Sequence, residues 1–90
     1  MNYTIEKLTT LIGARRYGDS DASIGFILTD SRSLCFPEET LFFFFFSDRN
    51  DGHNYIPELY RRGVRNFVVS EVPMGWASDY PEANFLKVVN

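Results

Sequence analysis

The run Leu41–Phe46, whose last five residues are all phenylalanine, constrains the fold of this chain more than any other feature. Six residues of extended chain span about 20 Å, the length of an ordinary strand. Because alternate side chains of a strand face opposite sides of a sheet, this run places large apolar groups on both faces. Strands of that kind are typical of parallel sheets that are covered by helices. The run therefore predicts a strand buried on both faces in an α/β domain.

The segments around the run alternate in the way that an α/β domain requires. Apolar residues recur at helical spacing over 5–12, after the N-cap residue Thr4, and a second helix is expected between Asn54 and Gly63. Further strands are expected over 24–29, 64–70 and 85–89, and residues 15–22 are interpreted as a turn or a weak edge strand. The order predicts a small mixed, mostly parallel sheet with two main flanking helices.

Length and composition limit the class of protein. Ninety residues, 44% of them hydrophobic and 23% charged, predict one globular domain covering 1–90. A net charge of −3 argues against nucleic-acid binding, and no run of residues is basic or apolar enough for membrane binding or insertion. The single cysteine, Cys35, and an N-terminus without the pattern of a signal peptide favour a cytoplasmic protein. Arg61 and Arg62, at the expected end of the second helix, are interpreted as complementing the helix dipole.

Two polar clusters lie where a ligand site is expected. Asp30-Ser31-Arg32 directly follows the strand 24–29, and Asp51-Gly52-His53-Asn54 precedes the second helix. Open α/β sheets bind ligands outside the carboxyl ends of their strands, and helix starts favour anions. Ser31 and Arg32 suit a phosphate or carboxylate, and Gly52 would allow close approach beside a donating His53. From spacing alone the simpler interpretation is preferred, with Arg32 paired to a surface carboxylate and His53 a loop residue.

The sequence shows no catalytic constellation. It contains no phosphate-binding loop of the form G-x-x-x-x-G-K-[ST], no G-x-G-x-x-G and no nucleophile elbow. One histidine and one cysteine do not make a recognisable metal site. We therefore expect the chain by itself to bind a ligand or nothing at all, to turn no substrate over, and to hold no cofactor.

The clusters and the segments between them resemble one known family. The order and spacing of these segments are similar to those in the N-terminal domain of the Mur ligases, with the MurF branch most similar and the MurE branch a near relative. The matching segments are Thr29-Asp30-Ser31-Arg32, Pro37, Leu41-Phe42-Phe43, Asp51-Gly52-His53-Asn54-Tyr55-Ile56, and Gly63 leading into Phe67-Val68-Val69. The likeness extends over nearly the whole chain.

The resemblance implies a function that the residues alone do not show. Mur ligases join an amino acid or dipeptide to a UDP-linked muramoyl peptide during cell-wall synthesis, using ATP and Mg²⁺. The MurF branch adds D-alanyl-D-alanine to UDP-N-acetylmuramoyl-tripeptide. Their N-terminal domain holds the UDP end of the substrate, whereas central and C-terminal domains bind ATP and the incoming group. Carried over, Ser31 and Arg32 approach the uridine and diphosphate, and the facing loop contains Asp51, Gly52, His53 and Asn54.

The phenylalanine run is where the chain departs from the family. At Phe44, Phe45 and Phe46 the family usually has a small residue, an aliphatic one and often a lysine. Overpacking of a strand commonly costs about 1–3 kcal/mol, and a missing lysine removes a phosphate contact. We therefore expect these three residues to weaken or abolish UDP binding. Two alternatives remain: a non-catalytic interaction module with Phe42–Phe46 partly exposed to a partner, or an engineered scaffold of the same fold.

Overall fold

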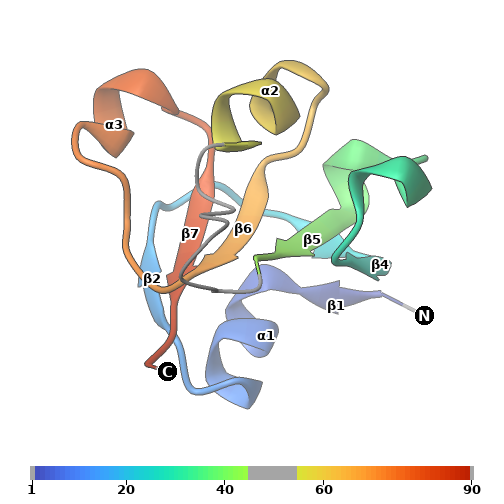
Figure 1. The fold of residues 1–90 in the computed structure, drawn as a ribbon. Coiled ribbons are helices and arrows are strands. Elements are labelled where there is room, and N and C mark those ends of the chain that lie inside the picture. The colour runs from blue at the N-terminus through green and yellow to red at the C-terminus, as the bar shows by residue number, and fades with distance from the viewer. Residues whose placement is uncertain (1, 45–54, 90) are drawn as a thin grey trace.

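A computed structural model describes residues 2–44 and 55–89 and contains a five-stranded mixed sheet (Figure 1). The strand order is β2-β7-β6-β5-β4, with four parallel strands and β2 antiparallel to β7 at one edge. The strands of this sheet are β2 (Arg15–Tyr17), β4 (Phe26–Leu28), β5 (Thr40–Phe43), β6 (Asn66–Val69) and β7 (Asn84–Lys87). The prediction of a small, mostly parallel α/β sheet is confirmed.

Helices cover both faces of the sheet. Figure 1 shows α2 (Ile56–Arg61) and α3 (Trp76–Asp79) on one side, and α1 (Ile5–Leu11) with β1 (Tyr3–Thr4) on the other. The predicted cap of α1 is present, because the Thr4 hydroxyl accepts a hydrogen bond of 3.1 Å from the Lys7 N–H. β1 pairs with β3 (Ser23–Ile24) in a separate antiparallel ribbon beside this helix.

The strand β5 divides its side chains between two hydrophobic cores. Leu41 packs with Ile5 and Leu8 of α1, whereas Phe42 and Phe44 pack with Ile56 and Leu59 of α2. The Phe44 N–H also donates to the Val68 carbonyl at 3.3 Å, so pairing with β6 continues past the last strand residue. Burial on both faces is confirmed for the described part of the phenylalanine run, and Phe45 and Phe46 lie outside the described residues.

Several local features differ from the prediction. The expected strand 24–29 is divided at Gly25 into β3 and β4, where the Gly25 N–H donates to the Glu39 carbonyl at 2.9 Å. β4 forms the edge of the sheet, so Phe26 and Ile27 stay exposed. The helix α3 was not predicted, because Pro73, Gly75 and Pro81 suggested only breaks. For residues 15–22 the sequence left open a turn or a weak edge strand, and Arg15–Tyr17 form the edge strand β2.

A buried polar network joins the amino ends of β6 and β7. Asn66 and Asn84 are fully buried, and the Asn84 amide donates to the Asn66 Oδ1 and to the Ser20 carbonyl, both at 2.9 Å. The Asn84 Oδ1 in turn accepts hydrogen bonds of 3.3 and 3.2 Å from the Arg16 guanidinium. Asn84 therefore ties β2, β6 and the segment around Ser20 together through one side chain.

We expect Asn84→Ala to destabilise the fold by about 1–3 kcal/mol, because it leaves the buried Asn66 Oδ1 without its donor and removes one acceptor from the partly buried Arg16 guanidinium. Urea unfolding followed by circular dichroism measures the change in unfolding free energy. Thr10→Ala, which removes an exposed hydroxyl with a 3.4 Å bond within α1, is the control and should change stability by less than about 1 kcal/mol. Equal effects of the two variants would contradict the role assigned to Asn84.

We expect Phe44→Ala to cost about 3–5 kcal/mol, because the Phe44 ring stacks on Phe67 at 6.0 Å between ring centres and its removal leaves a cavity. Phe36→Ala is the matched control: its ring is 54% exposed, and we expect a loss of at most about 1.5 kcal/mol from the stack with Phe26. Thermal unfolding of both variants provides the comparison. An unchanged or raised melting temperature for Phe44→Ala would show that the phenylalanine overpacks the strand instead.

Candidate functional site

The first polar cluster forms a short 3-10 helix, η1 (Ser31–Ser33), that directly follows β4. Asp30 is its N-cap residue, and the Asp30 Oδ1 accepts a hydrogen bond of 2.9 Å from the Arg32 N–H. β4 and β5 are adjacent and parallel, so η1 begins at the edge of the sheet where β5 also ends. This is the predicted position for Ser31 and Arg32, outside the carboxyl end of a strand.

Arg32 is engaged by the carboxylate two residues before it. The Arg32 Nε donates to both oxygens of Asp30 at 3.1 and 3.0 Å, and a terminal nitrogen of Arg32 lies 2.6 Å from the Asp30 Oδ2. The Arg32 side chain is nevertheless 88% exposed. The hydrogen bonds from the Arg32 side chain and N–H hold the pKa of Asp30 at about 2, and the Arg32 pKa is raised by the same pair. Pairing of Arg32 with a surface carboxylate, the simpler interpretation, is therefore observed.

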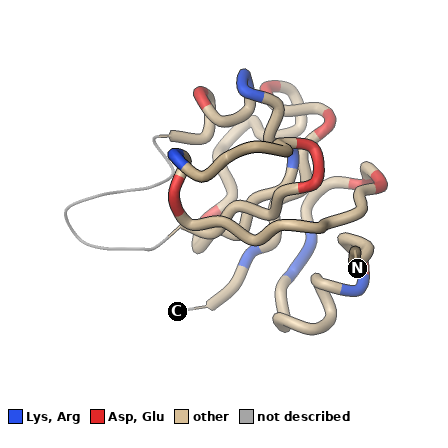
Figure 2. Tube along the Cα trace, turned by 90° about the vertical axis from the view of Figure 1, so that its right-hand side faces the viewer, with Lys and Arg blue, Asp and Glu red and all other residues tan. Residues whose placement is uncertain are grey.

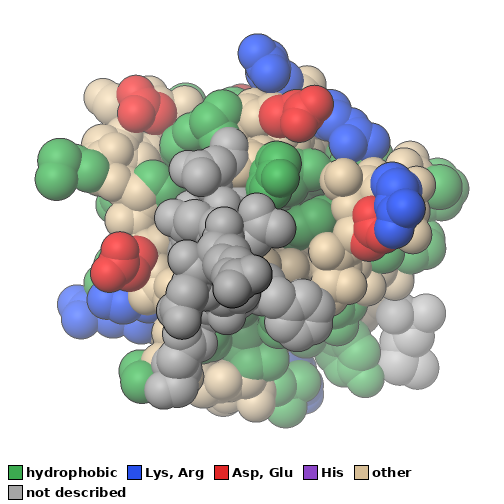
Figure 3. Space-filling model, in the orientation of Figure 1, with side chains coloured by type: hydrophobic (Ala, Val, Ile, Leu, Met, Phe, Trp, Pro, Cys, Tyr) green, Lys and Arg blue, Asp and Glu red, His purple; other side chains and the backbone are tan. Residues whose placement is uncertain are grey.

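A second arginine reaches the same 3-10 helix from α2. A terminal nitrogen of Arg62 donates to the Ser31 carbonyl at 3.2 Å, across 31 positions of sequence. Figure 3 shows basic and acidic side chains together on the upper right of this face, over α2 and the segment after β4. The position of Arg62 at the end of the helix suggests only an interaction with the helix dipole, and this contact was not predicted. No local signal predicts it, since the contact depends on how α2 packs relative to η1.

Arg65, three residues past the C-cap of α2, contacts the end of that helix. One of its terminal nitrogens donates to the Tyr60 carbonyl in the last turn of α2 at 2.6 Å, and its guanidinium lies 3.9 Å from the centre of the Tyr60 ring. Figure 2 shows basic and acidic residues interspersed along the described chain. The Arg65 side chain therefore points back to the last turn of α2, whereas the Arg62 side chain points to η1.

The second predicted cluster cannot be placed beside the first. Asp51, Gly52, His53 and Asn54 lie outside the described residues, and the description resumes at Tyr55, which precedes α2. Their approach to Ser31 and Arg32 stays a prediction. The expected effect of Phe44, Phe45 and Phe46 on ligand binding also stays a prediction. Phe44 lies in the core that α2 covers, and Phe45 and Phe46 lie outside the described residues.

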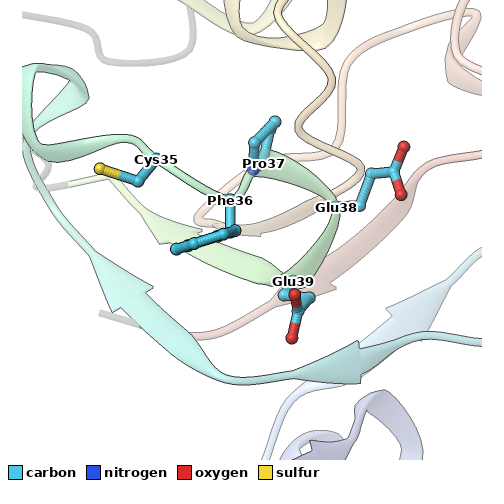
Figure 4. A pocket seen from close by; sticks show the side chains of 5 residues that line it. All are labelled: Cys35, Phe36, Pro37, Glu38 and Glu39. Carbon is cyan, nitrogen blue, oxygen red and sulfur yellow. The ribbon is translucent and has the colours of Figure 1, made fainter.

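One surface hollow in the described ranges lies at the 3-10 helix η2 (Pro37–Glu39) and offers no cation to a phosphate. This hollow has a volume of about 230 Å³. Figure 4 shows the side chains that line it, which are Cys35, Phe36, Pro37 and two glutamates. In residues 2–44 and 55–89, no three His, Cys, Asp or Glu side chains gather in a way that could hold a metal ion. No helix in these ranges has the length and apolar character needed to cross a membrane.

Comparison with known proteins identifies the class of fold. No family model matches the sequence, and no curated protein matches it at the sequence level. A solved structure does match over 100% of the chain, with a TM-score of 0.74 and 20% sequence identity. The chain therefore has the fold of a Mur ligase N-terminal domain.

The matching structure is that of UDP-N-acetylmuramoylalanyl-D-glutamyl-2,6-diaminopimelate–D-alanyl-D-alanyl ligase from Acinetobacter baumannii, an enzyme of the MurF type. The match lies in the N-terminal region of that ligase and covers 19% of its length. The chain thus spans about a fifth of the ligase that it resembles. The resemblance predicted from the two clusters is confirmed at the level of the fold.

We expect the Asp30 carboxyl to titrate with a midpoint near pH 2 in the folded chain. Its pKa is lower when folded than the ordinary value of 3.8, so its contribution to stability is present above about pH 4 and is lost as the pH falls through about 2. Carboxyl-carbon NMR shifts measure the midpoint. Arg32→Ala keeps the backbone donor but removes the side-chain bonds, so the midpoint should rise part of the way to 3.8. A midpoint near 4 in the unaltered chain would rule the pair out in solution.

Proposed function

We propose that residues 1–90 form the module that binds the UDP end of UDP-N-acetylmuramoyl-peptide in an ATP-dependent ligase of peptidoglycan synthesis. The observation that carries the proposal is the match of the whole chain to the corresponding region of a MurF-type ligase. In that fold, Ser31 and Arg32 lie just past the carboxyl end of β4, beside the end of β5. This edge is where open α/β sheets bind nucleotides.

The exposed groups at this edge suit a nucleoside diphosphate. Arginine offers a planar set of N–H donors that matches phosphate oxygens, and a serine hydroxyl can donate or accept a hydrogen bond. Both Arg32 and Arg62 lie at or beside η1, so a phosphate there would meet two guanidinium groups. Asp51, Gly52, His53 and Asn54 would face them from the loop before α2, as the family pattern implies.

The proposal assigns the chemistry of the reaction to other parts of a longer protein. ATP and Mg²⁺ would bind a central domain and D-alanyl-D-alanine a C-terminal one, in the cytoplasm where the UDP-linked precursor is made. The sequence of this chain has no phosphate-binding loop, and its described residues hold no cluster of metal ligands, so no step through ATP or Mg²⁺ is assigned to it. Its own residues bind and orient the substrate.

One alternative is a non-catalytic interaction module that presents the phenylalanine run to a partner. Phe42 and Phe44 are only 5% and 6% exposed, which counts against that alternative at these two positions, whereas Phe43 is partly exposed. The other alternative, an engineered scaffold that binds no ligand, differs from our proposal in what a titration with UDP would show.

We expect the chain to bind UDP saturably and more tightly than ADP, since the proposed site holds a uridine and not an adenosine. We also expect Phe46→Lys to tighten UDP binding by about tenfold, because it restores a charge-assisted phosphate contact of the family. Phe46→Met, of similar length and no charge, is the control and should not tighten it. NMR titration detects binding even at millimolar strength. If neither the chain nor Phe46→Lys prefers UDP to ADP, the proposed function is wrong.

A further inference from the structure

The two arginines beside η1 differ in how much positive charge they can offer to a ligand. Arg32 forms three hydrogen bonds with the Asp30 carboxylate through its Nε and one terminal nitrogen. Pairing with a carboxylate neutralises most of the field that a guanidinium presents to a nearby anion. Only the second terminal nitrogen of Arg32 has no bond to Asp30, and any anion that approaches it also approaches a carboxylate.

Arg62 is not compensated in this way. Across residues 2–44 and 55–89, the Asp30–Arg32 pair is the one ion pair, so Arg62 has no acidic partner in those ranges. Its one side-chain hydrogen bond there is to a neutral acceptor, the Ser31 carbonyl. A guanidinium has five N–H donors, so this bond uses one of them and leaves four without a partner among the described residues. The side chain is held next to Ser31 with its full charge.

We infer that Arg62, and not Arg32, supplies the main cationic contact to the diphosphate of a nucleoside diphosphate bound beside Ser31. The inference rests on the proposed function and adds a residue to the proposed site that the sequence pattern does not mark. In this arrangement the Asp30–Arg32 pair shapes η1, the Ser31 hydroxyl offers a hydrogen bond, and Arg62 binds phosphate oxygens through its fork of donors.

The packing of α2 on the sheet fixes the backbone position of Arg62. Ile56 and Leu59 on the inner side of this helix are 1% and 2% exposed, which fixes the helix on the sheet. Arg62 is the C-cap residue of α2, and its N–H donates to the Glu58 and Leu59 carbonyls at 3.1 Å. The backbone that carries the guanidinium is therefore held in place at the end of a buried helix.

The test is a titration of the 90-residue chain with UDP and with uridine, monitored by NMR or calorimetry. Arg62→Ala should weaken UDP binding by about tenfold, the loss expected for one charge-assisted contact, and leave uridine binding unchanged. Arg61→Ala is the matched control, since Arg61 is the adjacent residue of α2 with the same charge and should change UDP affinity by less than about twofold. Arg62→Lys should recover part of the loss.

The outcomes separate this inference from the proposed function. If the unaltered chain binds UDP but Arg62→Ala does so equally well, or if only Arg32→Ala weakens binding, Arg62 is not the diphosphate contact although the function stands. If Arg62→Ala weakens uridine and UDP to the same degree, Arg62 only braces η1 and the inference is also wrong. If only Phe46→Lys binds UDP, the same comparison of Arg62→Ala with Arg61→Ala is made in that variant and decides the inference. If neither the unaltered chain nor Phe46→Lys binds UDP, the proposed function and the inference fall together.

Discussion

Burial of both faces of β5 is the constraint on which the rest of the structure depends. Leu41 and Phe42 point to opposite sides of the sheet and are 0% and 5% exposed, so each side needs a covering layer. Helix α1 provides one layer and α2 with α3 the other. Burying a side chain of this size stabilises a fold by about 1.5–3 kcal/mol, which is a large share of what a small domain possesses. The positions of the helices, and of η1 beside them, follow from that requirement.

The sequence predicted the elements whose signals are local and strong. The capped helix at Ile5–Leu11, the buried strands β5 and β6, and the mixed sheet were all expected from apolar spacing and end signals. The short helix α3 was missed because its neighbouring prolines and glycine suggest a loop. It is stabilised instead by tertiary contacts, such as that of Trp76 with Phe85 at 6.2 Å between ring centres. The break of the first strand at Gly25 likewise depends on a distant partner, the Glu39 carbonyl.

In the candidate site, too, local contacts could be predicted from the sequence and tertiary contacts could not. Asp30, Ser31 and Arg32 are close in sequence, so their turn and their ion pair could be anticipated from residue types alone. The contact between Arg62 and the Ser31 carbonyl could not be anticipated, because it depends on the packing of α2 on the sheet. A sequence motif also shows which residues are charged, but it does not show which of them form ion pairs in the folded protein. The Asp30 carboxylate changes the electrostatic character of Arg32 while leaving the motif itself intact.

The buried amides on β6 and β7 have a consequence for the alignment of the strands. Asn66 lies directly opposite Asn84 in the parallel pair, and this register brings their side chains within hydrogen-bond distance, at 2.9 Å. A slip of β7 by one residue would turn Asn84 toward the opposite core, among the rings of Phe67 and its neighbours, and would bury an amide without a partner. Strands rich in phenylalanine and valine can pair in several registers, because similar apolar side chains follow one another along each strand. Their apolar residues therefore do not specify one register. The two asparagines at the amino ends of β6 and β7 thus favour one register of strands whose apolar residues could pair in several. This specificity lowers the stability of the fold, because the buried Asn66 Nδ2 has no hydrogen-bond partner among the described residues.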